Sequence, residues 1–256
     1  MDHEALTRLA DLRGRVAIVT GGTRGIGRAV AEGLACAGAS VVVASRKAEA
    51  CLETEERLRG LGAQAVGVPT HMGELDDVAN LVNRTVDTFG GIDIIVNNAA
   101  NALTQPLGGF TPEAWQKSFD VNLRGPVFLV QDGLPHLERS DHASVVNVIS
   151  AGAFLFSAGV AMYAAAKAAL MAFTRSMAAE YADRGIRVNA LAPGTVDTDM
   201  VRASPPEAQA AMARASAQGR AASPDEMVGP VLFLASDASS FMTGQVLLVD
   251  GGLTPH

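Results

Sequence analysis

Residues 15–38 read RVAIVTGGTRGIGRAVAEGLACAG, an apolar run followed by glycines and then by helical periodicity. We interpret 15–20 as a buried strand, 21–27 as a turn and 28–38 as a helix that ends at Gly38. Gly21 allows a tight turn, and Gly25 and Gly27 allow the backbone and the helix to approach a pyrophosphate closely. The pattern predicts a nucleotide site, although a glycine-rich turn alone is also compatible with a plain loop.

The second strand, 40–45, indicates which dinucleotide is bound. An acidic residue at its end would hold the hydroxyls of the adenosine ribose and indicate NAD. Here Ser45, Arg46 and Lys47 occupy that place, and a guanidinium can bind a 2′-phosphate through two hydrogen bonds. Arg24 in the glycine turn can reach the same region. We therefore expect NADP(H) to be preferred over NAD(H), the alternative being that Arg46 and Lys47 are solvated charges opening the next helix.

The remaining pattern alternates helices with apolar strands, which predicts an α/β fold with parallel strands and right-handed crossovers. Helical patterns cover 47–62, 74–90, 111–137, 161–183 and 223–237, and strand patterns cover 63–68, 92–97, 143–149, 186–194 and 244–252. Within 111–137, Gly125 and Pro126 predict a kink near Asn122. We expect one domain over residues 1–256, with a polar lead-in at 1–13 and a mobile substrate lid at 199–221.

A second chemically suggestive stretch is SVVNVISAGAFLFSAGVAMYAAAK, residues 144–167. Ser150 follows a buried strand, while Tyr163 and Lys167 share one face of a helix as an i,i+4 pair. A neighbouring cation favours the phenolate and brings the pKa of a tyrosine toward neutrality. The three side chains could move a proton on or off a carbonyl or alcohol oxygen; the alternative is an ordinary tyrosine, a solvated lysine and a turn serine.

Composition excludes several classes of protein. The chain has 256 residues, a net charge of −7 and 48% hydrophobic residues, and it has no dense Lys/Arg cluster. We therefore expect no nucleic-acid partner, no membrane span, no metal site and a cytoplasmic location. Cys36 and Cys51 lack metal-ligand spacing and are expected to be free thiols.

Taken together, the motifs TGGTRGIG, NNAA, Asn122, Ser150, YAAAK and APGTVDT resemble the short-chain dehydrogenase/reductase family over about residues 13 to 253. In particular the chain is similar to the 3-oxoacyl-carrier-protein reductases and the NADPH-dependent carbonyl reductases. The resemblance implies a doubly wound Rossmann-type fold, with a seven-stranded parallel sheet in the order 3-2-1-4-5-6-7 and helices on both faces. It also implies hydride transfer between a nicotinamide and a carbonyl or secondary alcohol.

The resemblance further implies a role for each motif residue. Tyr163 is the acid/base, Lys167 lowers its pKa and holds the nicotinamide ribose, Ser150 orients the substrate oxygen, and Asn122 supports a water-linked proton relay to Lys167. The cofactor contacts carry over to Gly21, Thr23, Arg24, Gly25, Ile26, Gly27, Asn98, Ala99, Pro193, Gly194, Val196 and Thr198, besides Ser45, Arg46, Tyr163 and Lys167.

The chain departs from the family pattern at two places. Ala100 replaces the last glycine of N-N-A-G, which affects how closely the backbone approaches the cofactor. The adenine-binding aspartate and its apolar neighbour are replaced by His71 and Met72. We expect either the neutral imidazole or the Met72 backbone to bind the adenine amino group, while a plain loop histidine remains the alternative.

The substrate is less well defined. Candidate pocket residues are mostly apolar and favour a hydrophobic ketone, although they could equally be core residues: Leu103, Phe154, Leu155, Phe156, Met162, Val196, Met200 and Val201. A 3-oxoacyl-carrier-protein reductase is the nearer alternative, and a non-catalytic NADP(H) sensor is an alternative of another class. The family also implies a homotetramer, with one interface on helices 112–137 and 161–183 and another on the last strand.

Overall fold

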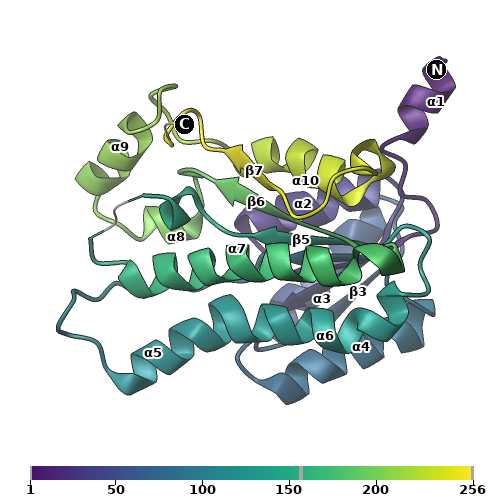
Figure 1. Cartoon of the computed structure of the whole chain (residues 1–256), viewed down its shortest axis with the longest axis horizontal. Coiled ribbons are helices and arrows are strands. Elements are labelled where there is room, and N and C mark those ends of the chain that lie inside the picture. The colour runs from purple at the N-terminus through teal and green to yellow at the C-terminus, as the bar shows by residue number, and fades with distance from the viewer. Residues whose placement is uncertain (1, 156–157, 255–256) are drawn as a thin grey trace.

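The computed structural model describes residues 2–155 and 158–254 (Figure 1). Its sheet has seven strands in the order β3-β2-β1-β4-β5-β6-β7. Every pairing is parallel. This confirms the predicted fold class and strand order. The strands are β1 (Val16–Thr20), β2 (Ser40–Ser45), β3 (Ala65–Pro69), β4 (Ile94–Asn97), β5 (Ser144–Val148), β6 (Arg187–Pro193) and β7 (Val246–Val249).

Helices connect these strands and cover both faces of the sheet (Figure 1). The α-helices are α1 (His3–Arg8), α2 (Gly25–Cys36), α3 (Ala48–Gly60), α4 (Leu75–Phe89), α5 (Pro112–Phe119), α6 (Gly125–Leu137), α7 (Ala161–Tyr181), α8 (Asp199–Arg202), α9 (Pro206–Arg214) and α10 (Val228–Ala235). Shorter helical turns are η1 (Asp120–Arg124), η2 (Ala151–Ala153), η3 (Ala182–Arg184), η4 (Pro224–Met227) and η5 (Asp237–Ser239).

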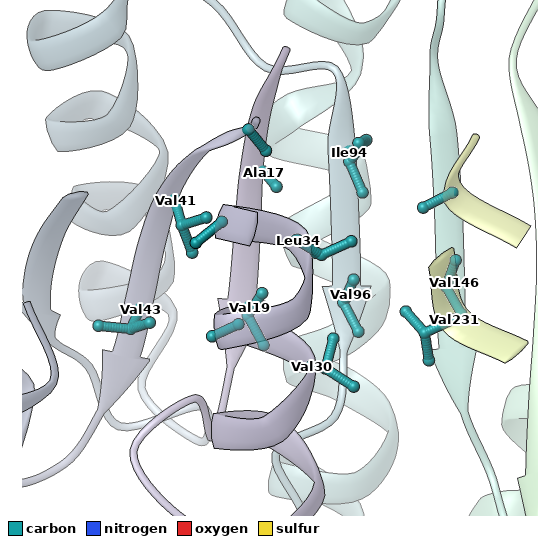
Figure 2. Close-up of a cluster of buried hydrophobic side chains, with 14 of the residues drawn as sticks. Ala17, Val19, Val30, Leu34, Val41, Val43, Ile94, Val96, Val146 and Val231 are labelled. Carbon is teal, nitrogen blue, oxygen red and sulfur yellow. The ribbon is translucent and has the colours of Figure 1, made fainter. Parts of the chain in front are cut away.

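The strands read as continuous apolar runs because both of their faces are buried. On one face, Val19 of β1 packs in the same cluster as Leu34 of α2 and Val231 of α10 (Figure 2). On the other face, the next residue along the strand, Ile18, packs in a cluster with Leu129 of α6. Successive side chains of a strand point to opposite faces, so the sheet holds a separate hydrophobic core on each side.

Two of the predicted helices are interrupted in the structure. The pattern at 111–137 divides into α5 and α6 around the π-helical turn η1, which contains Asn122, so the predicted kink is confirmed. Thr111 caps α5, its hydroxyl accepting the Ala114 N–H at 3.1 Å. The expected lid at 199–221 forms two short helices, α8 and α9; its closure over the site stays a prediction.

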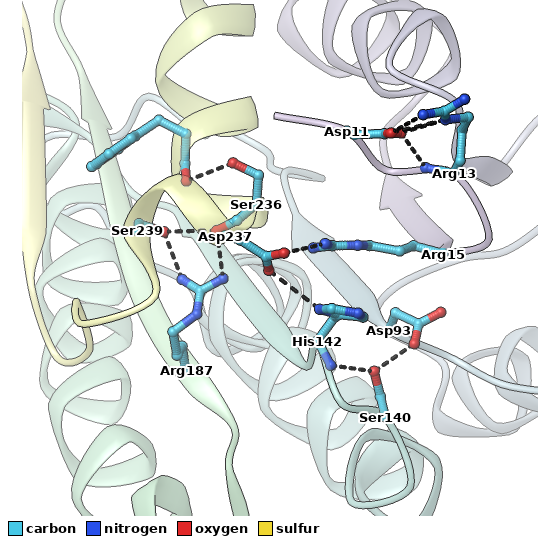
Figure 3. A network of polar contacts seen from close by, with 11 residues as sticks. Asp11, Arg13, Arg15, Asp93, Ser140, His142, Arg187, Ser236, Asp237 and Ser239 are labelled. Atoms are coloured by element: carbon cyan, nitrogen blue, oxygen red, sulfur yellow. Dashed lines mark hydrogen bonds and ion pairs between the residues drawn. The ribbon is translucent and has the colours of Figure 1, made fainter. Parts of the chain in front are cut away.

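The amino edge of the sheet is joined by a polar network (Figure 3). Arg15, directly before β1, pairs with Asp237 at 2.7 Å, and His142 contacts the same carboxylate at 3.2 Å. Arg187, at the start of β6, donates to the Ser239 hydroxyl at 2.7 Å. The network connects η5, close to the C-terminus, with the starts of β1, β5 and β6.

Cys36 and Cys51 are free thiols, as predicted. In the part of the chain that the structure describes, no helix combines the length and the apolar character needed to cross a bilayer. Among the same residues, no group of three or more His, Cys, Asp and Glu side chains is arranged to hold a metal ion.

Candidate functional site

The glycine turn lies against the loop that follows β4. The backbone N–H groups of Asn98 and Ala99 both donate to the Thr20 hydroxyl at 3.0 Å, and the Asn98 side chain donates to the Thr20 carbonyl at 2.8 Å. A Cβ added at Gly27 would lie 2.2 Å from the Gly21 carbonyl oxygen. A side chain at position 27 would therefore separate the helix from the turn. These bonds hold the loop after β4 against the glycine turn.

A cavity of about 640 Å³ opens along the carboxyl edge of the sheet. It is lined by residues that directly follow each of the strands β1 to β6, from Gly21 after β1 to Gly194 after β6. In an open parallel sheet this edge is the place where ligands bind. Tight turns hold the backbone there: Gly21 and Gly25 have φ of +64° and +50°, in the left-handed region that favours glycine.

The cavity collects the residues predicted to bind a dinucleotide. Those that line it are Gly21, Thr23, Arg24, Gly25, Ile26, Gly27, Ser45, Arg46, His71, Met72, Asn98, Ala99, Tyr163, Lys167, Pro193, Gly194, Val196 and Thr198. The N-terminus of α2 opens on this cavity with glycine at positions 25 and 27, and a helix N-terminus favours a phosphate. The actual contacts of these residues with a cofactor remain predictions.

Ser150, Tyr163 and Lys167 meet in the same cavity wall. Ser150 is the N-cap of η2, and its hydroxyl oxygen accepts the Gly152 N–H at 3.0 Å. Lys167 is 1% exposed, and its Nζ donates to the Val148 carbonyl at 2.7 Å. The same Nζ lies 5.8 Å from the centre of the Tyr163 ring. The strand end and the helix thus bring together the hydroxyl, the phenol and the ammonium.

Burial governs the titration of the pair. It raises the pKa of the Tyr163 phenol, while a hydrogen bond from Ser150 acts in the opposite direction. It also lowers the pKa of the Lys167 ammonium to about 8. The sequence predicted a lowered tyrosine pKa beside the cation; in this structure the largest effect is burial, which raises the pKa, and the phenol keeps its proton at neutral pH. A protonated phenol is the form that can give a proton to a carbonyl oxygen.

Asn122 is fully buried and does not line the cavity. Its side chain accepts the Asn101 N–H at 3.1 Å and donates to the Asn101 carbonyl at 2.8 Å and to the Ser118 carbonyl at 2.9 Å. The π-helical turn turns this amide toward the loop after β4. Asn122 therefore holds the cavity wall through Asn101, and its part in a proton relay to Lys167 remains a prediction.

The two departures from the family pattern lie in the cavity wall. Ala100 lines the cavity beside Asn98 and Ala99. The His71 Nδ1 accepts the Gly73 N–H at 3.2 Å, so the neutral tautomer that satisfies this bond carries its proton on Nε2. The ring then offers a donor rather than an acceptor. This tautomer favours the Met72 backbone over the imidazole as the partner of an adenine amino group, and both contacts remain predictions.

The candidate substrate residues divide into two groups. Leu103, Val196, Met200 and Val201 line the cavity. Met162, Phe154 and Leu155 do not line it. Met162 is buried, with 2% of its surface exposed, whereas Phe154 is 40% exposed. For these three the alternative of a place outside the pocket agrees with the lining of the cavity. Phe156 lies outside the described residues.

The sequence interpretation missed several residues of the wall. They are Ala44, Ala50, Thr70, Asn101, Lys117, Val121, Val148, Ile149 and Asp199. Lys117 and Val121 are one helical turn apart, and Val121 directly precedes Asn122, so their spacing from that asparagine was a usable signal. Asp199 pairs with Arg24 at 3.6 Å, which joins α8 to the glycine turn.

Comparisons with known proteins agree with this geometry. A family profile described as enoyl-(acyl carrier protein) reductase matches residues 21–254. The chain is 40% identical to the cis-4-hydroxycyclohexanecarboxylate dehydrogenase of Sinomonas cyclohexanicum, over 94% of this chain and 96% of that protein. It is 37% identical to a 3-oxoacyl-[acyl-carrier-protein] reductase of Chlamydia pneumoniae, over 95% and 98%. A crystal structure of a 3-oxoacyl-(acyl-carrier-protein) reductase from Agrobacterium tumefaciens with NADP bound superposes with a TM-score of 0.91, at 36% identity and over 98% and 100% of the two chains.

Proposed function

The chain belongs to the short-chain dehydrogenase/reductase family, whose members are oxidoreductases that act on alcohol and carbonyl groups. We propose that it is an NADP(H)-dependent enzyme for a hydrophobic ketone or the corresponding alcohol. The observation that carries the proposal is the meeting of Ser150, Tyr163 and Lys167 in a cavity that continues to the glycine turn. That cavity can hold a dinucleotide and a carbonyl side by side.

Each of these side chains has a separate task in the proposed reaction. A bound nicotinamide cofactor supplies or accepts the hydride. Tyr163, whose pKa burial raises above its ordinary value, keeps its proton at neutral pH and gives it to the carbonyl oxygen during reduction. Ser150 holds the same oxygen by a hydrogen bond. Lys167, fixed by the Val148 carbonyl, stabilises the phenolate that forms and faces the ribose.

The proposed preference for NADP(H) rests on the end of β2. Ser45, Arg46 and Lys47 line the cavity there, and no carboxylate accompanies them. Neither Arg46 nor Lys47 makes an ion pair within the described residues, so both cations are available to a 2′-phosphate. A carboxylate in this place would repel that phosphate.

The proposal is tested with purified protein, a panel of ketones, and NADPH and NADH side by side. We expect ketone-dependent loss of the absorbance of reduced nicotinamide, faster with NADPH at equal concentration. Tight NADPH binding without turnover of any ketone would instead favour the non-catalytic sensor. A higher kcat/KM with NADH would contradict the cofactor preference alone.

A second candidate is reduction of 3-oxoacyl groups on a carrier protein, which is the activity named for two of the similar proteins. An acidic carrier needs free cations around the mouth of the site. Of the three arginines in the expected lid, Arg202 is bonded to Asp197 at 2.8 and 2.9 Å and Arg220 to Glu226 at 2.8 Å, which leaves Arg214 among them. We therefore favour the free ketone; equal kcat/KM for a 3-oxoacyl carrier protein and for a ketone of the same chain length would reverse this choice.

We also propose that the protein is a homotetramer. Trp115 of α5 and Phe173 of α7 are 50% and 42% exposed, and Phe233 of α10 and Phe241 before β7 are 38% and 105% exposed. Large apolar side chains in two separate regions favour two interfaces. Light scattering should give four times the chain mass at micromolar concentration, and a monomer would contradict the proposal.

A further inference from the structure

The cavity is lined by cations although the chain as a whole is acidic. The protein carries a net charge of −7, yet five cationic side chains line the cavity, and Asp199 is the one carboxylate found in its described wall. The cations are Arg24, Arg46, Lys47, Lys117 and Lys167. A cleft with one sign of charge attracts ligands of the opposite sign. The proposed function assigns Arg46, Lys47 and Lys167, and Arg24 pairs with Asp199, which leaves Lys117 without a task.

Lysine is rare in this chain, and its distribution is informative. The sequence contains three lysines, at positions 47, 117 and 167, and all three line this cavity. The surface ion pairs of the described residues use arginine or histidine as the cation instead. Lys117 is itself exposed at the rim of the cavity, and it takes no part in these ion pairs.

The ammonium of Lys117 has no ionic partner within residues 2–155 and 158–254. Asp120, one turn further along, is engaged by Arg124 at 3.1 Å, and Glu113, one turn earlier, forms no ion pair with Lys117. The backbone at this position is nevertheless fixed, because the Lys117 carbonyl accepts the Asn101 side-chain N–H at 3.0 Å. A cation on a fixed turn without a partner is available to a ligand.

The surroundings of Lys117 indicate the kind of ligand. Val121 follows Lys117 by one helical turn, and Leu103 of the loop after β4 lines the same cavity, as do Met200 and Val201 of α8. Ser150 and Tyr163, which hold the reacting oxygen in the proposed mechanism, stand on other elements. A ligand that fills this space meets apolar side chains, a hydroxyl pair and one separate positive charge.

We propose that Lys117 binds a carboxylate of the substrate. The substrate is then a keto acid or the matching hydroxy acid, in which an apolar body separates the carboxylate from the carbon that is reduced or oxidised. This inference rests on the proposed function and names its substrate class. Lys117 is a specificity-determining residue in this scheme, because the ion pair selects among ketones and the proton transfer at Tyr163 does not involve it.

The test compares 4-oxocyclohexanecarboxylate with the uncharged 4-oxocyclohexanecarboxamide, which has nearly the same shape. We expect the wild-type kcat/KM to favour the carboxylate, and Lys117→Met to lower that preference about tenfold, mainly through KM. Lys117→Arg should retain much of it, and the carboxamide rate should change little. Arg84→Met, which removes an exposed cation of α4 outside the cavity wall, is the matched control and should leave the preference intact.

Other results would overturn the inference. An unchanged preference in Lys117→Met would show that the ammonium does not meet the carboxylate. An increase in the KM of NADPH that is equal for both ketones would assign Lys117 to a cofactor phosphate instead. Reduction of the carboxamide shows that the enzyme turns over ketones whether or not Lys117 binds a carboxylate. If the proposed function were wrong, neither ketone would be reduced, so the two failures give different results.

Discussion

The Nζ atom of Lys167 donates a 2.7 Å hydrogen bond to the carbonyl oxygen of Val148, two residues before Ser150. This contact joins α7 to the end of β5, so it sets the distance between the helix that carries Tyr163 and the strand end that carries Ser150. Lys167 also lies 5.8 Å from the centre of the Tyr163 ring. A single buried side chain therefore determines both the geometry and the charge of the proposed catalytic group.

Removal of the phenol hydroxyl should abolish turnover without unfolding the protein. We expect Tyr163→Phe to lower kcat about 1,000-fold, because proton transfer to the carbonyl oxygen then lacks its donor. NADPH binding, measured by fluorescence titration, should change much less. The chain has one other tyrosine, Tyr181 at the end of α7, and Tyr181→Phe is the matched control. Equal losses in both variants would contradict a special role for Tyr163.

Burial of Lys167 should appear in the pH dependence of stability. Its pKa is lowered from 10.5 to about 8 in the folded chain, so between these values the unfolded state binds the additional proton and stability rises with pH. Relative to Lys167→Met, the wild type should gain about 3 kcal/mol in the free energy of unfolding across that window. Urea titrations of both proteins at pH 7.5 and pH 10.5 measure the difference; a constant difference would be inconsistent with a buried ammonium.

Deprotonation of Lys167 should also lower the activity at high pH. Above pH 8 Lys167 loses its charge and no longer stabilises the phenolate, so we expect kcat of ketone reduction to fall as pH rises through about 8. The phenol itself keeps its proton over this range because burial raises the pKa of Tyr163. A pH–rate profile under saturating cofactor measures this, and a rate that climbs from pH 8 to pH 10 would argue against it.

Reversal of charge at the end of β2 should change the cofactor preference. Arg46→Asp should lower the ratio of kcat/KM with NADPH to that with NADH at least tenfold, because a carboxylate repels a 2′-phosphate and binds ribose hydroxyls. Steady-state kinetics with both cofactors give the ratio. Arg84→Asp introduces the same charge change on α4, outside the cavity wall, and should not alter it. An unchanged ratio in Arg46→Asp would remove Arg46 from the phosphate site.

Two glycines should respond oppositely to alanine. Gly27→Ala would place a Cβ 2.2 Å from the Gly21 carbonyl and 2.4 Å from the Asn98 amide, so we expect a loss of about 1–3 kcal/mol in stability and weaker NADPH binding. Gly60, exposed at the end of α3, has no atom within 4 Å of such a Cβ, and Gly60→Ala should stabilise by roughly 0.5–1 kcal/mol. Thermal unfolding with and without NADPH compares them; a neutral Gly27→Ala would contradict the close approach.

Local patterns determined the fold and the location of the nucleotide site. Apolar runs at β1 and β2, with a glycine turn and a helix between them, define a parallel crossover because both strand faces must be buried. Gly21, Gly25 and Gly27 are readable from sequence since no other residue suits those backbone positions. The spacing of Tyr163 and Lys167 likewise follows from helical periodicity alone.

Tertiary structure alone decided the properties that depend on surroundings. The buried Asn122 holds Asn101 instead of lining the cavity, and Met162 packs in the interior rather than in the pocket. Burial raises the pKa of Tyr163. The spacing of two residues along a helix does not show how deeply either side chain is buried, so this shift could not be predicted from the sequence. The place of Lys117 in the cavity wall could not be predicted from the sequence. That wall is formed by strand ends and by α5, which are distant from one another in the chain.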